Sequence, residues 1–104
     1  MPSKKFDQRL KRVQLLAAIR LEKRIKFAYA HGYLTDYLLR IGLSPELSSE
    51  LDEANFKLTR LIVAAQAVLQ DKISRARQKG YLKDYLKKIN MLDLLMHHKH
   101  IRTT

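Results

Sequence analysis

The feature of this chain that most limits its possible folds is an internal repeat. Residues 10–41 match residues 58–89 at a constant offset of 48, with 13 identities in 32 positions and no gap. The closest agreement lies between Gly-Tyr-Leu-Thr-Asp-Tyr-Leu-Leu-Arg-Ile, starting at Gly32, and Gly-Tyr-Leu-Lys-Asp-Tyr-Leu-Lys-Lys-Ile, starting at Gly80. Because glycine and polar positions match as well as apolar ones, shared amphipathicity does not explain the agreement. We therefore predict a duplicated unit made of a long helix, a glycine and a short helix.

Apolar residues recur at helical spacing in four segments, which predicts an all-α fold. The expected helices cover residues 4–31, 33–41, 44–80 and 81–96. Neither unit can bury its apolar face alone, so we expect the long helices to pack together with the short helices folded over their ends. The result is a single four-helix bundle-like domain over residues 1–96, with repeats at about 4–43 and 45–96 and a flexible tail at 97–104.

The run from Ser44 to Gly80 carries the longest helical signal. Ser44 and Pro45 suit the N-cap and the first helical position, and acidic residues follow at the positive end of the helix dipole. Apolar residues then recur at alternating spacings of four and three, which is typical of a helix that packs lengthwise on another. These positions are Leu47, Leu51, Ala54, Leu58, Leu61, Ala65 and Val68. At about 1.5 Å per residue, such a helix is longer than a domain of this size is wide, and its exposed seam predicts a homodimer.

The chain is strongly basic. Its 21 Lys and Arg against 10 Asp and Glu give a formal charge of +11, which favours an acidic partner such as nucleic acid, an acidic protein surface or anionic lipid. The cations concentrate in residues 1–31 and 72–104, whereas residues 32–71 carry more acids than bases. We predict that the two basic blocks meet in one phosphate-binding surface. The candidate contacts are Lys5, Arg9, Arg12, Arg20, Lys23, Arg75, Arg77 and Lys79.

Two simpler interpretations of these cations stay open. The cations form a solvated face, or those of the first long helix pair with the acids near the start of the third. These acids are Glu46, Glu50, Asp52 and Glu53. Because the six acids of residues 32–71 cannot neutralise the excess charge, a polyanion site is favoured. No helix-turn-helix, zinc-finger or RNA-recognition pattern occurs in the sequence, so sequence-specific reading of bases is not predicted.

Paired tyrosines open both short helices, Tyr33 with Tyr37 and Tyr81 with Tyr85. Aromatic residues among basic ones suit single-stranded nucleic acid, because bases stack on them. The alternative is that the rings plug the ends of the bundle while their hydroxyls reach water or a neighbouring Asp. We favour the second interpretation, because each pair lies on the apolar face of its helix.

Several kinds of chemistry lack support in the sequence. Cysteine is absent, and we expect no signal peptide, no membrane span and a cytoplasmic location. His97, His98 and His100 have no acidic or Cys companions, so they do not predict a metal site. No phosphate-binding loop, activated nucleophile or isolated carboxylate pair is present. We therefore expect a protein without cofactor or metal that is not an enzyme.

The segment Leu58 to Gly80 resembles part of the FlhD-type subunit of bacterial flagellar master regulators. The similarity rests on Leu61, Ala64, the run Gln70-Asp71-Lys72, Ser74 and Gly80, and it covers less than a quarter of the chain. Proteins of that family are helical dimers that join a DNA-binding partner subunit to activate transcription. The resemblance thus implies a regulator that acts on DNA within a protein complex.

Taken together, these features predict a small basic helical protein that binds DNA or RNA through phosphates, as a homodimer, in transcription regulation or nucleoprotein assembly. The alternative is an adaptor or inhibitor that grips an acidic surface of a partner protein, with the apolar seam as its anchor. Binding of the first helix to an anionic membrane is a weaker third possibility.

Overall fold

The computed structural model describes residues 4–95, with the side chains of residues 4–7 and 53 left aside. Its helices are α1 (Lys4–Ala30), α2 (Leu34–Arg40), α3 (Leu58–Lys79) and α4 (Leu82–Lys88). Three short 3₁₀ turns complete it, η1 (Pro45–Leu47), η2 (Glu53–Asn55) and η3 (Leu92–Leu95). The described part of the chain contains no strand, so the predicted all-α fold is confirmed. The predicted tail at 97–104, with its three histidines, lies outside the described residues.

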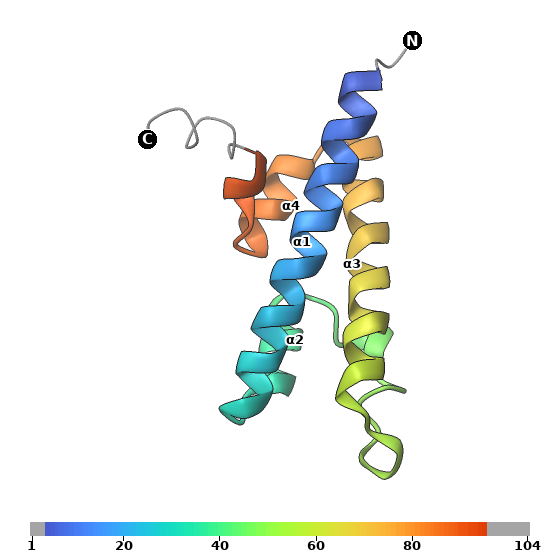
Figure 1. Cartoon of the computed structure of the whole chain (residues 1–104), viewed down its shortest axis with the longest axis vertical. Helices are drawn as coiled ribbons and strands as arrows, with labels where there is room; N and C mark the ends of the chain where they lie inside the picture. The colour runs from blue at the N-terminus through green and yellow to red at the C-terminus, as the bar shows by residue number, and fades with distance from the viewer. Residues whose placement is uncertain (1–3, 96–104) are drawn as a thin grey trace.

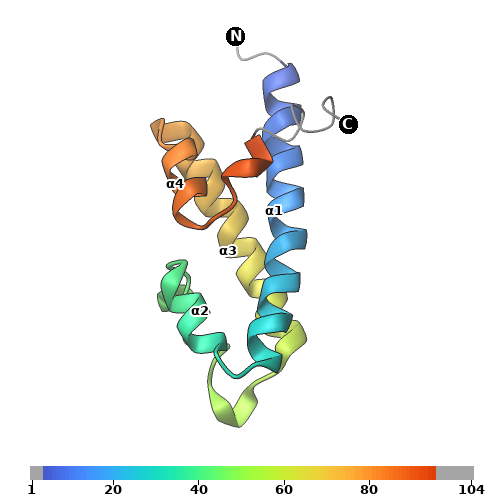
Figure 2. The ribbon, with the colours of Figure 1, turned by 90° about the vertical axis from the view of Figure 1, so that its left-hand side faces the viewer.

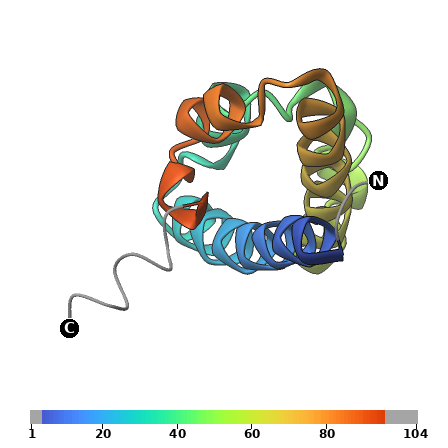
Figure 3. The ribbon, with the colours of Figure 1, turned by 90° about the horizontal axis from the view of Figure 1, so that it is seen from above.

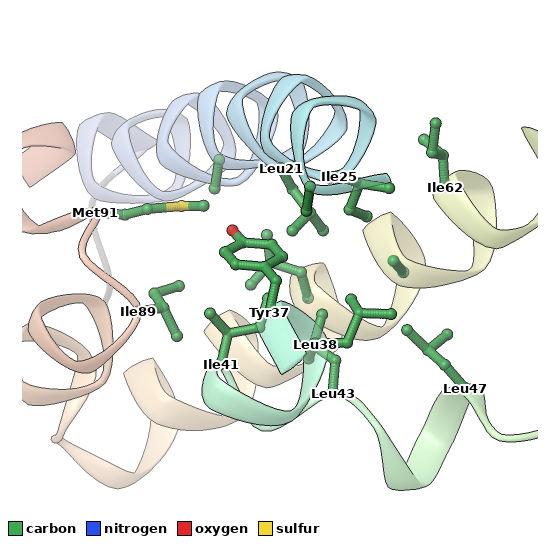
Figure 4. Packing of buried hydrophobic residues seen from close by; sticks show 14 of the residues in the cluster. Leu21, Ile25, Tyr37, Leu38, Ile41, Leu43, Leu47, Ile62, Ile89 and Met91 are labelled. Atoms are coloured by element: carbon green, nitrogen blue, oxygen red, sulfur yellow. The ribbon is translucent and has the colours of Figure 1, made fainter. Parts of the chain in front are cut away.

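The two long helices run antiparallel, and both short helices lie on the same side of this pair (Figures 1 and 2). Seen from above, the helices outline a rough square (Figure 3). Helices α1 and α3 form two adjacent sides of it, and α2 and α4 lie opposite the corner where α1 and α3 meet. The space between these elements is filled by buried side chains, among them Leu21 and Ile25 of α1 and Leu38 of α2 (Figure 4). The predicted apolar faces of both long helices are thus the ones that form the core.

The two halves have the same local structure at the offset of 48. Helix α2 shifted by 48 residues is α4. Each long helix is followed within two residues by a glycine with positive φ, +80° at Gly32 and +84° at Gly80. Between α3 and α1, the side-chain amide of Gln66 donates to the carbonyl oxygen of Ala18, a residue 48 positions earlier. This symmetry agrees with the predicted repeat, while its origin by duplication stays a prediction.

The prediction of one helix over residues 44–80 is wrong in its first part, because α3 begins only at Leu58. Ser44 makes no capping hydrogen bond with its side chain. The carboxylate of Asp52 instead accepts from the N–H of Ala54 at 3.1 Å, a local bond that competes with helix formation. Leu47 is fully buried in the core. On a straight extension of α3 it would lie about 16 Å beyond Leu58, away from that core.

The predicted helix over residues 81–96 also ends early. Helix α4 stops at Lys88, and Asn90 then adopts a left-handed conformation with φ of 62°. Asn90 occupies the position equivalent to Gly42, which follows α2 and has a φ of 79°. Asparagine tolerates this conformation better than most residues, so it reverses the chain as glycine does. The backbone then returns toward α1 through η3.

The seam that predicted a homodimer is covered within the chain. Leu61 and Ala65 are fully buried against the other helices, so they offer no surface to a second copy. The large apolar side chains left exposed on the outer faces of the long helices include Leu15, Ile19 and Val63. None of the described helices is both long enough and apolar enough to cross a bilayer.

Candidate nucleic-acid interface

A pocket of about 590 Å³ opens between α1, α2 and the end of α4. Five cationic side chains line it, and three aromatic ones lie among them. The cations are Arg20, Lys23, Arg24, Arg40 and Lys88, and the aromatics are Phe27, Tyr33 and Tyr37. The described residues that line this basic–aromatic pocket include no Asp or Glu. Its walls therefore combine concentrated positive charge with flat apolar rings.

Helical periodicity and one glycine turn place most of these side chains. On α1, Arg20, Lys23, Arg24 and Phe27 recur at spacings of three, one and three, so they share one flank beside the core stripe. The left-handed turn at Gly32 reverses the chain, and the N–H of Tyr33 bonds to the carbonyl oxygen of Ala28 at 2.9 Å. Helix α2 then folds back along α1 (Figure 2), and its residues Tyr37 and Arg40 line the same pocket.

Two arginines of α1 anchor the second half of the chain to this wall. The guanidinium of Arg24 donates to the carbonyl oxygens of Ile89 at 3.3 Å and Asn90 at 3.1 Å. The guanidinium of Arg20 makes a bidentate pair with the carboxylate of Asp93, at 2.6 and 2.8 Å. Hydrogen bonding in this pair raises the pKa of Arg20 and lowers that of Asp93. The pair neutralises Arg20, so its main contribution is to hold η3 against α1.

The other three cations keep their charge available. Lys23, Arg40 and Lys88 are exposed, and none of them forms an ion pair within the described part of the chain. They come from three different helices, α1, α2 and α4 respectively, and all three line the pocket. Such an arrangement suits an anion with several charged oxygens, because each cation approaches it from a different direction.

The aromatic residues take two different positions. Tyr37 is buried in the core, and its hydroxyl points from α2 toward α1 (Figure 4) without a hydrogen-bond partner among the described residues. Burial raises its pKa, and the charge of Arg24 partly offsets this. Phe27 is 56% exposed, with its ring stacked on His31 at 4.0 Å and in edge contact with Tyr33 at 6.3 Å. The buried Tyr37 ring agrees with the interpretation favoured from the sequence, in which the tyrosine rings pack into the bundle. Its hydroxyl, however, does not reach a neighbouring Asp among the described residues.

The equivalent flank of α3 carries a smaller pocket of about 400 Å³ with a different charge pattern. At the offset of 48, Val68, Asp71, Lys72 and Arg75 stand where α1 has Arg20, Lys23, Arg24 and Phe27. Lys72 pairs with Glu46 at 3.1 Å, and Arg75 pairs with Asp71 at 3.1 Å. Both of its cations are paired with carboxylates of the same chain, so this counterpart pocket is a poor anion site.

Comparison with protein families, curated proteins and solved structures finds no match to this chain. The described residues also hold no group of three or more His, Asp or Glu side chains able to bind a metal ion.

The structure separates the predicted phosphate contacts into three groups. Arg20 and Lys23 line the basic–aromatic pocket, whereas Arg9 and Arg12 are exposed nearer the start of α1. The side chain of Lys5 lies outside the described set. On α3, Arg75 is ion-paired, Arg77 is partly buried and Lys79 is exposed in the last turn. Residues two apart on a helix point about 200° away from each other, so Arg75 and Arg77 do not share a face.

Sequence reasoning missed three cations and one ring of the pocket, namely Arg24, Arg40, Lys88 and Phe27. A signal for two of them was present. Arg40 and Lys88 occupy equivalent positions of the repeat, both basic and both at the end of a short helix. Their convergence with α1 depends on how the helices pack, which the repeat alone does not specify.

Proposed function

We propose that this protein binds nucleic acid without catalysis, through phosphate contacts at the basic–aromatic pocket. The observation that carries the proposal is the gathering of five cations around one pocket without a carboxylate in its lining. Only Arg20 among them has an ion-pair partner within the described residues. With a formal charge of +11 on the whole chain, a polyanion is the partner that this surface favours most.

A role in transcription regulation or nucleoprotein assembly in the cytoplasm is the corresponding biological proposal. The resemblance of Leu58 to Gly80 to FlhD-type regulator subunits supports it, since those proteins act on DNA together with a partner subunit. A homodimer belongs to the same proposal, although the buried seam of α3 no longer supports it. The molar mass of the purified protein in solution tests this part.

Salt dependence of binding tests the phosphate contacts. We expect the affinity for a nucleic acid of mixed sequence to fall steeply with salt. Lys23→Gln and Lys88→Gln should each lower the slope of log affinity against log salt by about one. Lys83→Gln removes the same charge from an exposed position of α4 that does not line the pocket, so its slope should fall less. Fluorescence anisotropy over a salt series measures all four proteins, and equal slopes for the three variants would contradict the assignment of the site.

A second candidate is an adaptor or inhibitor that binds an acidic protein surface. Exposed apolar side chains on the long helices favour it. Leu15 and Ile19 lie one turn apart on α1, and Val63 occupies the position of α3 equivalent to Leu15. Such residues serve as anchors in protein interfaces, with surrounding cations steering the partner. A pull-down after nuclease treatment separates the candidates, because a protein partner is retained whereas nucleic acid is lost.

A further inference from the structure

We propose that the basic–aromatic pocket receives one unpaired nucleotide of a single-stranded nucleic acid. Its base packs against Phe27 and Tyr33, and its phosphates lie near Lys23, Arg40 and Lys88. This inference rests on the proposed function and narrows it, because it selects single strands over duplex. It also assigns roles to aromatic residues that phosphate binding alone leaves unused.

The size and shape of the pocket favour a single nucleotide. Its volume of about 590 Å³ lies within the range of roughly 300–1,000 Å³ that is usual for small-molecule sites. A duplex is far wider than such a pocket and keeps its bases stacked inside the helix. Flat rings can therefore contact a base only after it leaves the stack, as it does in single strands.

The rings are positioned for such a contact. Phe27 is 56% exposed although it is apolar, and His31 covers one face of its ring. Tyr33 meets Phe27 edge-on, at an interplanar angle of 71°, so the two rings form a corner at the pocket wall. Tyr37 adds a buried hydroxyl without a partner among the described residues, and this hydroxyl is able to donate to a phosphate or a base edge.

The counterpart pocket provides an internal comparison. At the positions equivalent to Phe27 and Lys23 it has Arg75 and Asp71, which pair with each other at 3.1 Å. It thus lacks the exposed ring, and a carboxylate stands where a phosphate would bind. Tyr81, the equivalent of Tyr33, is not among the residues that line this counterpart pocket. Only the first of the two equivalent flanks combines exposed cations with an exposed aromatic corner.

The experiment compares base-bearing and abasic strands. Fluorescence anisotropy measures binding of the full chain to a labelled single strand, to an abasic strand of equal length and to the matching duplex, at one salt concentration. Stacking of one base contributes about 1–3 kcal/mol, so Phe27→Leu should weaken binding of the base-bearing strand about fivefold or more. Binding of the abasic strand should not change. Tyr29→Leu is the matched control, because Tyr29 is 50% exposed on the same helix but does not line the pocket.

Three results would overturn the inference while leaving phosphate binding intact. They are equal affinity of the unmodified protein for base-bearing and abasic strands, tighter binding of the duplex, and equal losses in Phe27→Leu and Tyr29→Leu. If the unmodified protein bound none of these nucleic acids at low salt, that result would instead overturn the proposed function itself. The comparison of strands on the unmodified protein needs no substitution, so it decides the matter even if Phe27→Leu folds poorly.

Discussion

At the scale of single residues, the ion pair of Arg20 and Asp93 joins two positions that lie 73 residues apart in the sequence. It closes the second half of the chain onto α1 beside the pocket. The geometry is bidentate, which is the stronger form of a charged hydrogen bond. Both side chains keep access to solvent, with exposed fractions of 30% and 51%, so screening reduces what the pair contributes.

We expect Asp93→Asn to lower the free energy of unfolding by about 0.5–1 kcal/mol at pH 7, and less in high salt. The pKa of Asp93 is lowered in the folded state, from an ordinary value of 3.8. The contribution is therefore present above that value and is lost as the pH falls through the lowered pKa. Urea unfolding at neutral and acid pH measures it. In a double-mutant cycle with Arg20→Gln, a coupling energy of zero would contradict the pair's role.

At the scale of elements, the two short helices α2 and α4 are ended in the same way. Helices α2 and α4 have seven residues each, and each is followed after one residue by a left-handed residue, Gly42 or Asn90. In both, the next backbone N–H then donates to a carbonyl oxygen of the helix. The N–H of Leu43 donates to the carbonyl oxygen of Leu38 at 2.9 Å, and the N–H of Met91 donates to that of Leu86 at 2.8 Å. This reversal buries Leu43 and Met91 in the core.

Substitutions at Asn90 test this stop signal. Asn90→Gly should leave stability almost unchanged, because glycine adopts a φ of 62° without strain. Asn90→Ala should cost about 1 kcal/mol, since its Cβ disfavours the left-handed conformation. Gly42→Asn provides the matched change in the first half and should be tolerated. Chemical denaturation compares the three variants, and an Asn90→Ala protein as stable as Asn90→Gly would rule out this explanation.

At the scale of the whole molecule, the two halves close on each other. Helix α1 of the first half contacts both α3 and η3 of the second half. The long helices also pack along each other, with Gln14 of α1 donating to Ser74 and to the carbonyl oxygen of Gln70 on α3. Since each half supplies part of the other's core, we expect one cooperative unit.

Equivalent core residues test that expectation. Leu38 and Leu86 are both fully buried at the offset of 48. Leu38→Ala and Leu86→Ala should each lower the free energy of unfolding by about 2–5 kcal/mol. Unfolding of both variants, followed by circular dichroism and by tyrosine fluorescence, should show a single coincident transition. Two separate transitions would mean that the halves fold independently.

The all-α class, the first long helix, the core faces and the repeat could be predicted from helical periodicity and the offset of 48, because both are local patterns along the chain. The other features depend on how the helices pack. Because Leu47 is buried in the core, α3 begins only at Leu58, and the packing of α4 brings Lys88 to the same pocket as Lys23. A pocket depends on distances between residues far apart in sequence, and only packing sets those distances.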